Sequence, residues 1–231
     1  MITLVSDFDN TFYTLHYLDN IDAICEFVND GNYFFLTSER NYTQMLSETK
    51  NFNIPYSFLI CDDGALIYDF YGNQVYQKQI SKNVSKEVFK FLEDSHLFYE
   101  IWYDTGDEYT LSDDAGVYKI LAKPKDYEKI DEFLKTFNGK FPMVNVQSLE
   151  NWIHIMDKEV SKSNAIKELS KMYDFDENKV YTVGDDVNDL SMIKDYRGFA
   201  MKNSIDEIKK YAIKEVETFD EIINIIKEDS K

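Results

Sequence analysis

Two aspartates one residue apart, Asp7 and Asp9, come directly after the apolar run ITLV near the start of the chain. A carboxylate at the end of a strand can act as a nucleophile, as an acid or base, or as a ligand for a hard cation. In an acidic chain, however, an Asp-x-Asp pair on its own is more often a solvated turn. The pair gains a chemical meaning only from the groups that accompany it.

A second acidic cluster, GDDVND at residues 184–189, follows the apolar run KVYTV. If the two runs are neighbouring parallel strands, their carboxyl ends meet and bring three or four carboxylates together. Crowded carboxylates repel one another, and a hard divalent cation such as Mg²⁺ relieves that repulsion. The other interpretation is a pair of unrelated acidic loops.

Hydroxyl and cationic groups follow in two further places. The stretch YFFLTSER ends a third apolar run in Thr37, Ser38 and Arg40, and EVSKSNAIKEL places Lys162 at the start of an amphipathic helix. Each of these groups alone would be an ordinary solvated residue. Their meaning depends on whether one fold brings them to the same place as the two acidic clusters.

Apolar runs and helix-like stretches alternate at both ends of the chain. The runs at residues 2–5, 33–36 and 57–60 each end in polar residues, and so do those at 179–183 and 198–201. This alternation is typical of a parallel sheet covered by helices on both faces. The ligand site of such a sheet lies beyond the carboxyl ends of its strands, which is where the polar groups fall.

The middle of the chain has a different pattern. Helices are predicted near residues 84–95 and 126–137, with short aromatic strands such as FYEIWY and VYKILAK between them. Such strands favour a mixed or antiparallel sheet with helices on one side. The sequence therefore predicts an α/β core with a Rossmann-like parallel sheet, residues 1–79 and 154–231, and a small inserted α+β cap domain, residues 80–153.

Taken in order, these motifs resemble those of the haloacid dehalogenase (HAD) superfamily, and most of all its Cof-type phosphatases. That family has DxDGT, a strand ending in T-G-R, a lysine in a context such as G-V-S-K-G, and G-D-x-x-N-D. This chain has DFDNT, TSER, EVSKS and GDDVND in the same order. CDDGALIYD and GFAMKNSIDEIKKYA also resemble the family's N-G-A-x-I and G-x-A-M-G-N-A stretches. The resemblance implies the HAD fold, with the cap inserted between the second and third motifs.

The resemblance also implies a reaction and a role for each acidic residue. The enzyme would be an Mg²⁺-dependent phosphatase of small phosphomonoesters, and Asp7 would attack phosphorus to form an aspartyl-phosphate. Asp9 would protonate the leaving oxygen and later deprotonate the attacking water. Asp7, Asp185 and the main-chain carbonyl of Asp9 would bind Mg²⁺, while Asp189 would orient the catalytic lysine.

The phosphoryl oxygens would be bound by Lys162, Asn188 and a strand-end hydroxyl. A gapless alignment of Arg40 with the arginine of T-G-R assigns that hydroxyl to Ser38, whereas Thr37 requires a one-residue insertion. The substrate would be a sugar phosphate or a nucleotide-like cofactor phosphate. The alternatives are a sugar phosphomutase of similar layout and a phospho-accepting or binding protein without turnover.

Four positions depart from the family pattern, and each stands where the family has a glycine or an asparagine. An asparagine replaces the glycine of DxDGT and is the residue that best tolerates a left-handed backbone. Two of the others add negative charge near the expected mouth of the site. The four are Asn10, Glu39, Asp63 and Lys202.

Composition excludes several classes of partner and site. With 231 residues and a net charge of −18, the chain repels nucleic acid and anionic membrane surfaces. Cys25 and Cys61 lie in apolar stretches, which predicts buried free thiols in a reducing compartment. With no leader-like segment and no long apolar run, a cytoplasmic protein is expected, and its oligomeric state is left open.

Overall fold

Eight strands form the main sheet in the described part of the chain, which comprises residues 1–149 and 151–229 of a computed structural model. The six strands from β13 to β3 run parallel to one another. Of the remaining two, β4 is antiparallel to β3, and β5 is antiparallel to β4. This confirms the predicted α/β core. In order across the sheet the strands are β13 (Lys214–Val216), β12 (Arg197–Met201), β11 (Val180–Gly184), β1 (Thr3–Asp7), β2 (Tyr33–Thr37), β3 (Phe58–Cys61), β4 (Leu66–Asp69) and β5 (Gln74–Gln77).

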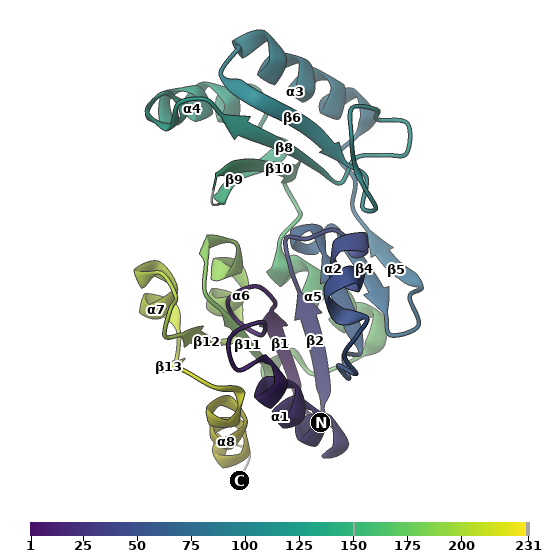
Figure 1. Cartoon of the computed structure of the whole chain (residues 1–231), viewed down its shortest axis with the longest axis vertical. Helices are drawn as coiled ribbons and strands as arrows, with labels where there is room; N and C mark the ends of the chain where they lie inside the picture. Colours follow the sequence, from purple (N-terminus) through teal and green to yellow (C-terminus); the bar gives the residue numbers. More distant parts are fainter. Residues whose placement is uncertain (150, 230–231) are drawn as a thin grey trace.

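Helices cover both faces of this sheet (Figure 1). One face packs against α1 (Tyr17–Asn29), α2 (Tyr42–Thr49) and α8 (Phe219–Asp229), which contribute Ile24, Met45 and Phe219 to one apolar cluster. The other face packs against α5 (Lys162–Tyr173) and α6 (Leu190–Asp195) through a second cluster. The short helix α7 (Asp206–Tyr211) follows β12. Covered on both faces, the inner strands β1, β11 and β3 are buried along their whole length, as the strands of such parallel sheets are.

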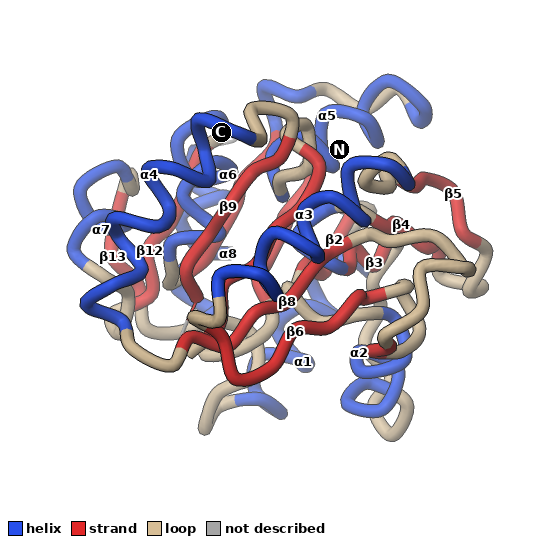
Figure 2. The backbone as a smooth tube through the Cα atoms, turned by 90° about the horizontal axis from the view of Figure 1, so that it is seen from above, coloured by secondary structure: helices blue, strands red, loops and turns tan. Residues whose placement is uncertain are grey.

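A second sheet forms the predicted cap, inserted between β5 and β11. Side chains on one of its faces, including Tyr103, Ile120 and Ile155, pack against α3 (Lys82–Ser95) and α4 (Ile130–Lys140). Figure 2 shows both helices lying over the strands, on the side away from the core. The antiparallel strands are, in order, β7 (Tyr109–Thr110), β6 (Phe98–Asp104), β8 (Lys119–Pro124), β10 (Trp152–Asp157) and β9 (Val144–Leu149).

The sequence places the return from cap to core at residue 154. That position lies inside β10, which pairs with β8 and β9 as far as Met156 and Asp157. We therefore propose that the cap extends to Asp157. Cys61 is buried as expected, Cys25 is only partly buried, and both are free thiols. Among the described residues no helix is both long and apolar enough to span a membrane.

A buried lysine joins the cap to the core. Lys119 begins β8, has 1% of its surface exposed, and places its Nζ 3.1 Å from Asp62 and 3.8 Å from Asp63. Its ammonium group also donates to the main-chain carbonyl of Glu39. Burial alone lowers the pKa of Lys119, but the two aspartates more than offset it and raise that pKa above its ordinary value. A cation from the cap is thus paired with core carboxylates that have almost no access to water.

We expect Lys119→Met to destabilise the protein strongly, because Asp62 and Asp63 would remain buried without their cation. Removing one partner of a buried ion pair costs about 3–5 kcal/mol of unfolding free energy. Urea unfolding followed by circular dichroism measures this loss. Lys123→Met, in the same strand but only partly buried and without a carboxylate partner among the described residues, is the matched control and should change stability by less than about 0.5 kcal/mol. Equal losses in the two variants would contradict the role given to Lys119.

Candidate active site

Three neighbouring strands end at one edge of the core sheet and bring the predicted residues together. β1 lies between β11 and β2, and Asp7 at its end is in register with Thr37. The carboxyl end of β11 leads into the GDDVND loop. Asp9 follows in the loop after β1, where Asn10 has a φ of +57°. This left-handed conformation is the one expected of an asparagine in the position of a glycine.

Lys162 lies between two aspartates at the centre of the site. It is the first residue of α5, directly after the helix-capping Ser161, and its side chain is fully buried. Its Nζ donates to Asp7 Oδ1 at 2.5 Å and to Asp189 Oδ1 at 2.6 Å. Burial acts to lower the pKa of Lys162, but the two carboxylates raise it well above its ordinary value. The lysine is therefore held as a cation beside Asp7.

The GDDVND loop folds back on itself so that Asp189 can reach Lys162. Asp189 Oδ2 accepts hydrogen bonds from the main-chain N–H groups of Asp185 (2.9 Å) and Asp186 (3.3 Å). The loop passes so close to the strand end that a Cβ atom on Gly184 would lie 2.4 Å from the Asp189 carboxyl carbon. Only glycine fits there, which explains the first residue of this motif.

Carboxylate oxygens of Asp7, Asp185 and Asp189 lie within 4.8 Å of one another and could hold a metal ion. Both Asp189 oxygens already accept hydrogen bonds, and Thr11 donates to Asp185 Oδ1 at 2.7 Å. Among the described residues no hydrogen bond reaches Oδ2 of Asp7 or of Asp185. These two oxygens are the donors left for a cation.

Electrostatics favour a cation at these two oxygens. Burial and the neighbouring Asp189 raise the pKa of Asp7 well above its usual value, and Lys162 acts in the opposite direction. Burial likewise raises the pKa of Asp185 to about 6, although the hydrogen bond from Thr11 lowers it. A hard divalent cation would relieve this repulsion, and oxygen donors on carboxylates are the ligands that Mg²⁺ takes. The residues present therefore fit Mg²⁺.

Arg40 clamps Asp9, a contact that the sequence analysis did not foresee. Its Nε and one terminal nitrogen donate to the two oxygens of Asp9 at 2.8 and 2.7 Å. These hydrogen bonds raise the pKa of Arg40 above its ordinary value. A bidentate arginine–carboxylate pair fixes orientation as well as charge. The only sequence signal was the arginine of TSER, which served to align the motif.

The remaining predicted residues lie next to this centre. Ser38 is fully buried, and its hydroxyl oxygen accepts the N–H of Arg40 at 3.1 Å. The Thr37 hydroxyl is buried without a hydrogen-bond partner among the described residues. Asn188 donates its side-chain N–H to Asp63 Oδ1 at 3.0 Å. Asp63 is also one of the two core carboxylates beside Lys119 of the cap. The phosphate-binding roles given to Ser38 and Asn188 stay predictions.

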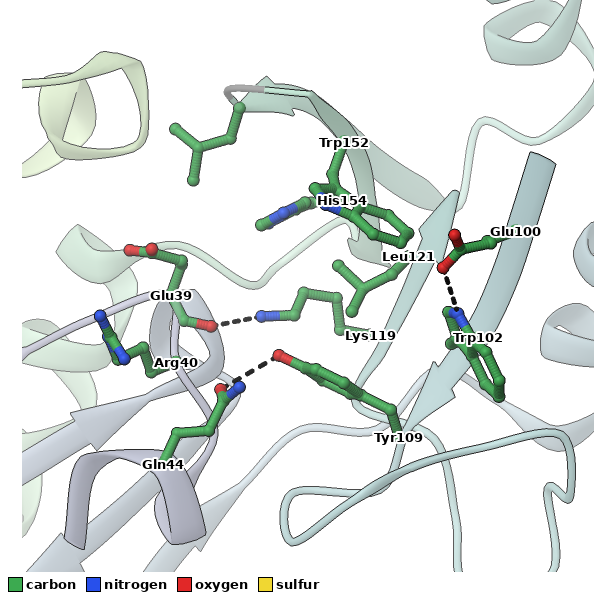
Figure 3. A pocket seen from close by; sticks show the side chains of 11 residues that line it. Glu39, Arg40, Gln44, Glu100, Trp102, Tyr109, Lys119, Leu121, Trp152 and His154 are labelled. Carbon is green, nitrogen blue, oxygen red and sulfur yellow. Dashed lines mark hydrogen bonds between the residues drawn. The ribbon is translucent and has the colours of Figure 1, made fainter. Parts of the chain in front are cut away.

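A cavity of about 330 Å³ separates the cap from this centre. It lies under the core-facing side of β6, β8 and β10 (Figure 3). Glu39 and Leu149 line both this cavity and the small catalytic one, which Asp7 and Asp9 also line. Burial, with a contribution from Asp63, raises the pKa of Glu39 to about 7. The two cavities thus meet at a carboxylate that stands where the resembling family has glycine.

Comparison with known proteins identifies this arrangement. The sequence matches the family described as haloacid dehalogenase-like hydrolase over residues 4–116 and 104–224. A protein of Buchnera aphidicola subsp. Baizongia pistaciae, provisionally named a phosphatase, is 28% identical over 240 residues. That alignment covers 90% of this chain and 88% of the Buchnera protein.

Solved structures share the whole fold. A haloacid dehalogenase-like hydrolase from Bacillus subtilis superposes with a TM-score of 0.84 at 20% identity, covering 98% of this chain and 99% of that one. The HAD subclass IIB sugar phosphatase BT4131 superposes with a TM-score of 0.81 at 17% identity, covering 100% and 99%. The chain therefore belongs to the haloacid dehalogenase-like hydrolases.

Proposed function

We propose that this phosphatase hydrolyses small phosphomonoesters by forming an aspartyl-phosphate on Asp7, with Mg²⁺ as cofactor. The observation that carries the proposal is the buried contact of Asp7 with Lys162, beside the unpaired oxygen of Asp185. A cation within 2.5 Å of the nucleophile offsets the repulsion between a carboxylate and an incoming phosphoryl group. The substrate would be a sugar phosphate or a nucleotide-like cofactor phosphate.

The side chains divide the reaction between them. Asp7 attacks phosphorus through a carboxylate oxygen, and the bond from phosphorus to the ester oxygen breaks. Asp9 gives its proton to the departing oxygen, then takes a proton from the water that hydrolyses the aspartyl-phosphate. Arg40 donates to both Asp9 oxygens and sets the orientation of that group, so one of these hydrogen bonds opens before Asp9 carries a proton. Lys162 and Ser38 position the phosphoryl oxygens.

The metal would be held by Asp7, Asp185 and the main-chain carbonyl of Asp9. When bound, Mg²⁺ supplies positive charge that lets the anionic nucleophile and the anionic phosphate approach each other. Asp189 takes no part in binding it, because both its oxygens are occupied by Lys162 and by the loop N–H groups. Its role is to fix the position of Lys162.

Substitutions of Asp7 and of Asp9 are expected to block different steps of the reaction. Asp7→Asn should show no turnover of 4-nitrophenyl phosphate, because no covalent intermediate can form. Asp9→Asn should still release a first equivalent of the phenolate, which leaves without a proton, and then release phosphate about 10²–10⁴-fold more slowly than wild type. Stopped-flow absorbance and phosphate release measure the two steps. A burst of phenolate from Asp7→Asn, or no burst from Asp9→Asn, would refute this division of roles.

The alternative of a sugar phosphomutase is tested by giving the wild-type enzyme a sugar phosphate. An isomerised sugar phosphate with little free phosphate would indicate a mutase.

A second pair of variants tests which hydroxyl binds phosphate. Ser38→Ala removes a proposed hydrogen bond to a charged oxygen, so kcat/KM should fall by about 10- to 100-fold. Thr37→Val keeps the shape of a buried hydroxyl that has no partner, and kcat/KM should change by less than about threefold. Steady-state kinetics on one substrate compares them. The opposite order of effects would assign the phosphate contact to Thr37.

Magnesium affinity should weaken in acid. Without metal the pKa of Asp185 is about 6, so below that pH a proton competes with Mg²⁺ for the carboxylate. The apparent dissociation constant should therefore be about tenfold larger at pH 5 than at pH 7.5. Isothermal titration calorimetry of the protein with Mg²⁺ measures this dissociation constant at each pH. An affinity that does not change between these pH values would remove Asp185 from the metal site.

A further inference from the structure

The register of the cap strands decides which side chains face the core. Trp102 on β6 pairs with Leu121 on β8, and Leu121 pairs with His154 on β10. Trp152 lies two residues before His154 and so points to the same face. Figure 3 shows Trp102 and Trp152 on either side of Leu121. We call these three residues the ring wall.

Both tryptophans of the chain therefore line the same cavity. Each is only partly buried, although cap tryptophans without a ligand could equally have packed against α3 or α4. Two partly open indoles beside a leucine offer a flat apolar surface, and flat rings stack on such a surface. The cavity is large enough for a leaving group of one or two rings.

Most polar groups of the cavity are already paired with one another. Tyr109 donates its hydroxyl to Gln44 at 3.0 Å, and the Trp102 ring N–H donates to Glu100 at 3.3 Å. Arg40 is held by Asp9. A sugar with many hydroxyls would lose its hydrogen bonds to water here and find few replacements. The lining thus suits a flat ring better than a polyol.

The charges that line the cavity also favour some leaving groups over others. Its two cations, Arg40 and Lys119, are each paired with carboxylates. Glu39 and Glu100 form no ion pair within the described ranges 1–149 and 151–229. Lys123 lies over the Trp152 ring at 5.4 Å and does not line the cavity. The field inside is negative, so a leaving group with a second anionic group is repelled.

We propose that the leaving group of the substrate carries a flat ring that stacks on the ring wall, is uncharged or cationic, and has no second anionic group. Glu39, where the two cavities meet, faces the leaving group next to the ester and accepts a hydrogen bond from a hydroxyl or amine. The proposal rests on the proposed function, because it takes the phosphate to lie at Asp7. It narrows the substrate from phosphomonoesters in general to those of ring-bearing alcohols of this type, amino alcohols included.

Binding can be measured without turnover, because both tryptophans lie in the cavity and their fluorescence reports on a ligand there. Asp7→Asn with Mg²⁺ is titrated with four phosphate esters. Benzyl and cyclohexylmethyl phosphate have rings of equal atom number that differ in flatness. The 4-(aminomethyl)benzyl and 4-carboxybenzyl esters differ in charge. We expect benzyl to bind about fivefold more tightly than cyclohexylmethyl, and the amine about tenfold more tightly than the carboxylate.

Variants assign each preference to its residue. Trp152→Leu should abolish the preference for the flat ring and keep the preference for the amine. Binding to this variant is followed by the fluorescence of the remaining Trp102. Glu39→Gln should reduce the preference for the amine and keep the preference for the flat ring. Tyr99→Leu is the matched control, because this β6 aromatic is 68% exposed and does not line the cavity. It should keep both preferences.

Several results would overturn the proposal. Equal binding of the two ring esters, tighter binding of the carboxylate than of the amine, or tighter binding of glucose 6-phosphate than of benzyl phosphate would each do so. The same esters are also given to the wild-type enzyme. If the binding preferences hold but no ester is hydrolysed, the proposed function fails and the binding proposal stands. If the esters are hydrolysed but the binding preferences are not found, the binding proposal fails and the proposed function stands.

Discussion

The whole active site depends on one buried cation, Lys162, between Asp7 and Asp189. A lysine without access to water is costly unless carboxylates surround it, and the carboxylates are equally costly without the lysine. The three residues come from β1, the start of α5 and the loop after β11, so each side chain fixes the position of the others. The central order of the sheet, with β1 between β11 and β2, is what allows this meeting. Asp7 and Asp185 then line the same small cavity.

A second buried cation, Lys119, gives the cap a defined position over this centre. Its contact with the Glu39 carbonyl ties β8 to the loop that also carries Ser38 and Arg40. Its partner Asp63 accepts a hydrogen bond from Asn188, which belongs to the GDDVND loop. The cap is therefore connected through polar contacts to two of the motifs that form the candidate site. The shape of the cavity between them follows from this attachment as much as from its lining.

Much of the fold and site could be predicted because strand ends and motif order are local properties of a sequence. Apolar runs followed by polar residues place Asp7 and Asp185 at one sheet edge without any knowledge of side-chain directions, and the order of the motifs assigns Lys162 to the same site. The clamp of Arg40 on Asp9 could not be predicted, since it depends on how two loops bend towards each other. Nor could the partner of Asn188. The predicted boundary falls inside β10, whose apolar residues suit either sheet.

Asp7 and its cation Lys162 are separated by 155 positions, with the whole cap between them. During synthesis Asp7 leaves the ribosome long before Lys162, and at about 5–20 residues per second the wait is roughly 8–30 s. In that interval β1, β2 and β3 exist without β11 and without α5, so one face of the nascent sheet is uncovered. The cap, whose five strands and two helices are contiguous in sequence, can be completed first. The order of synthesis therefore allows the cap to fold before the core sheet is complete.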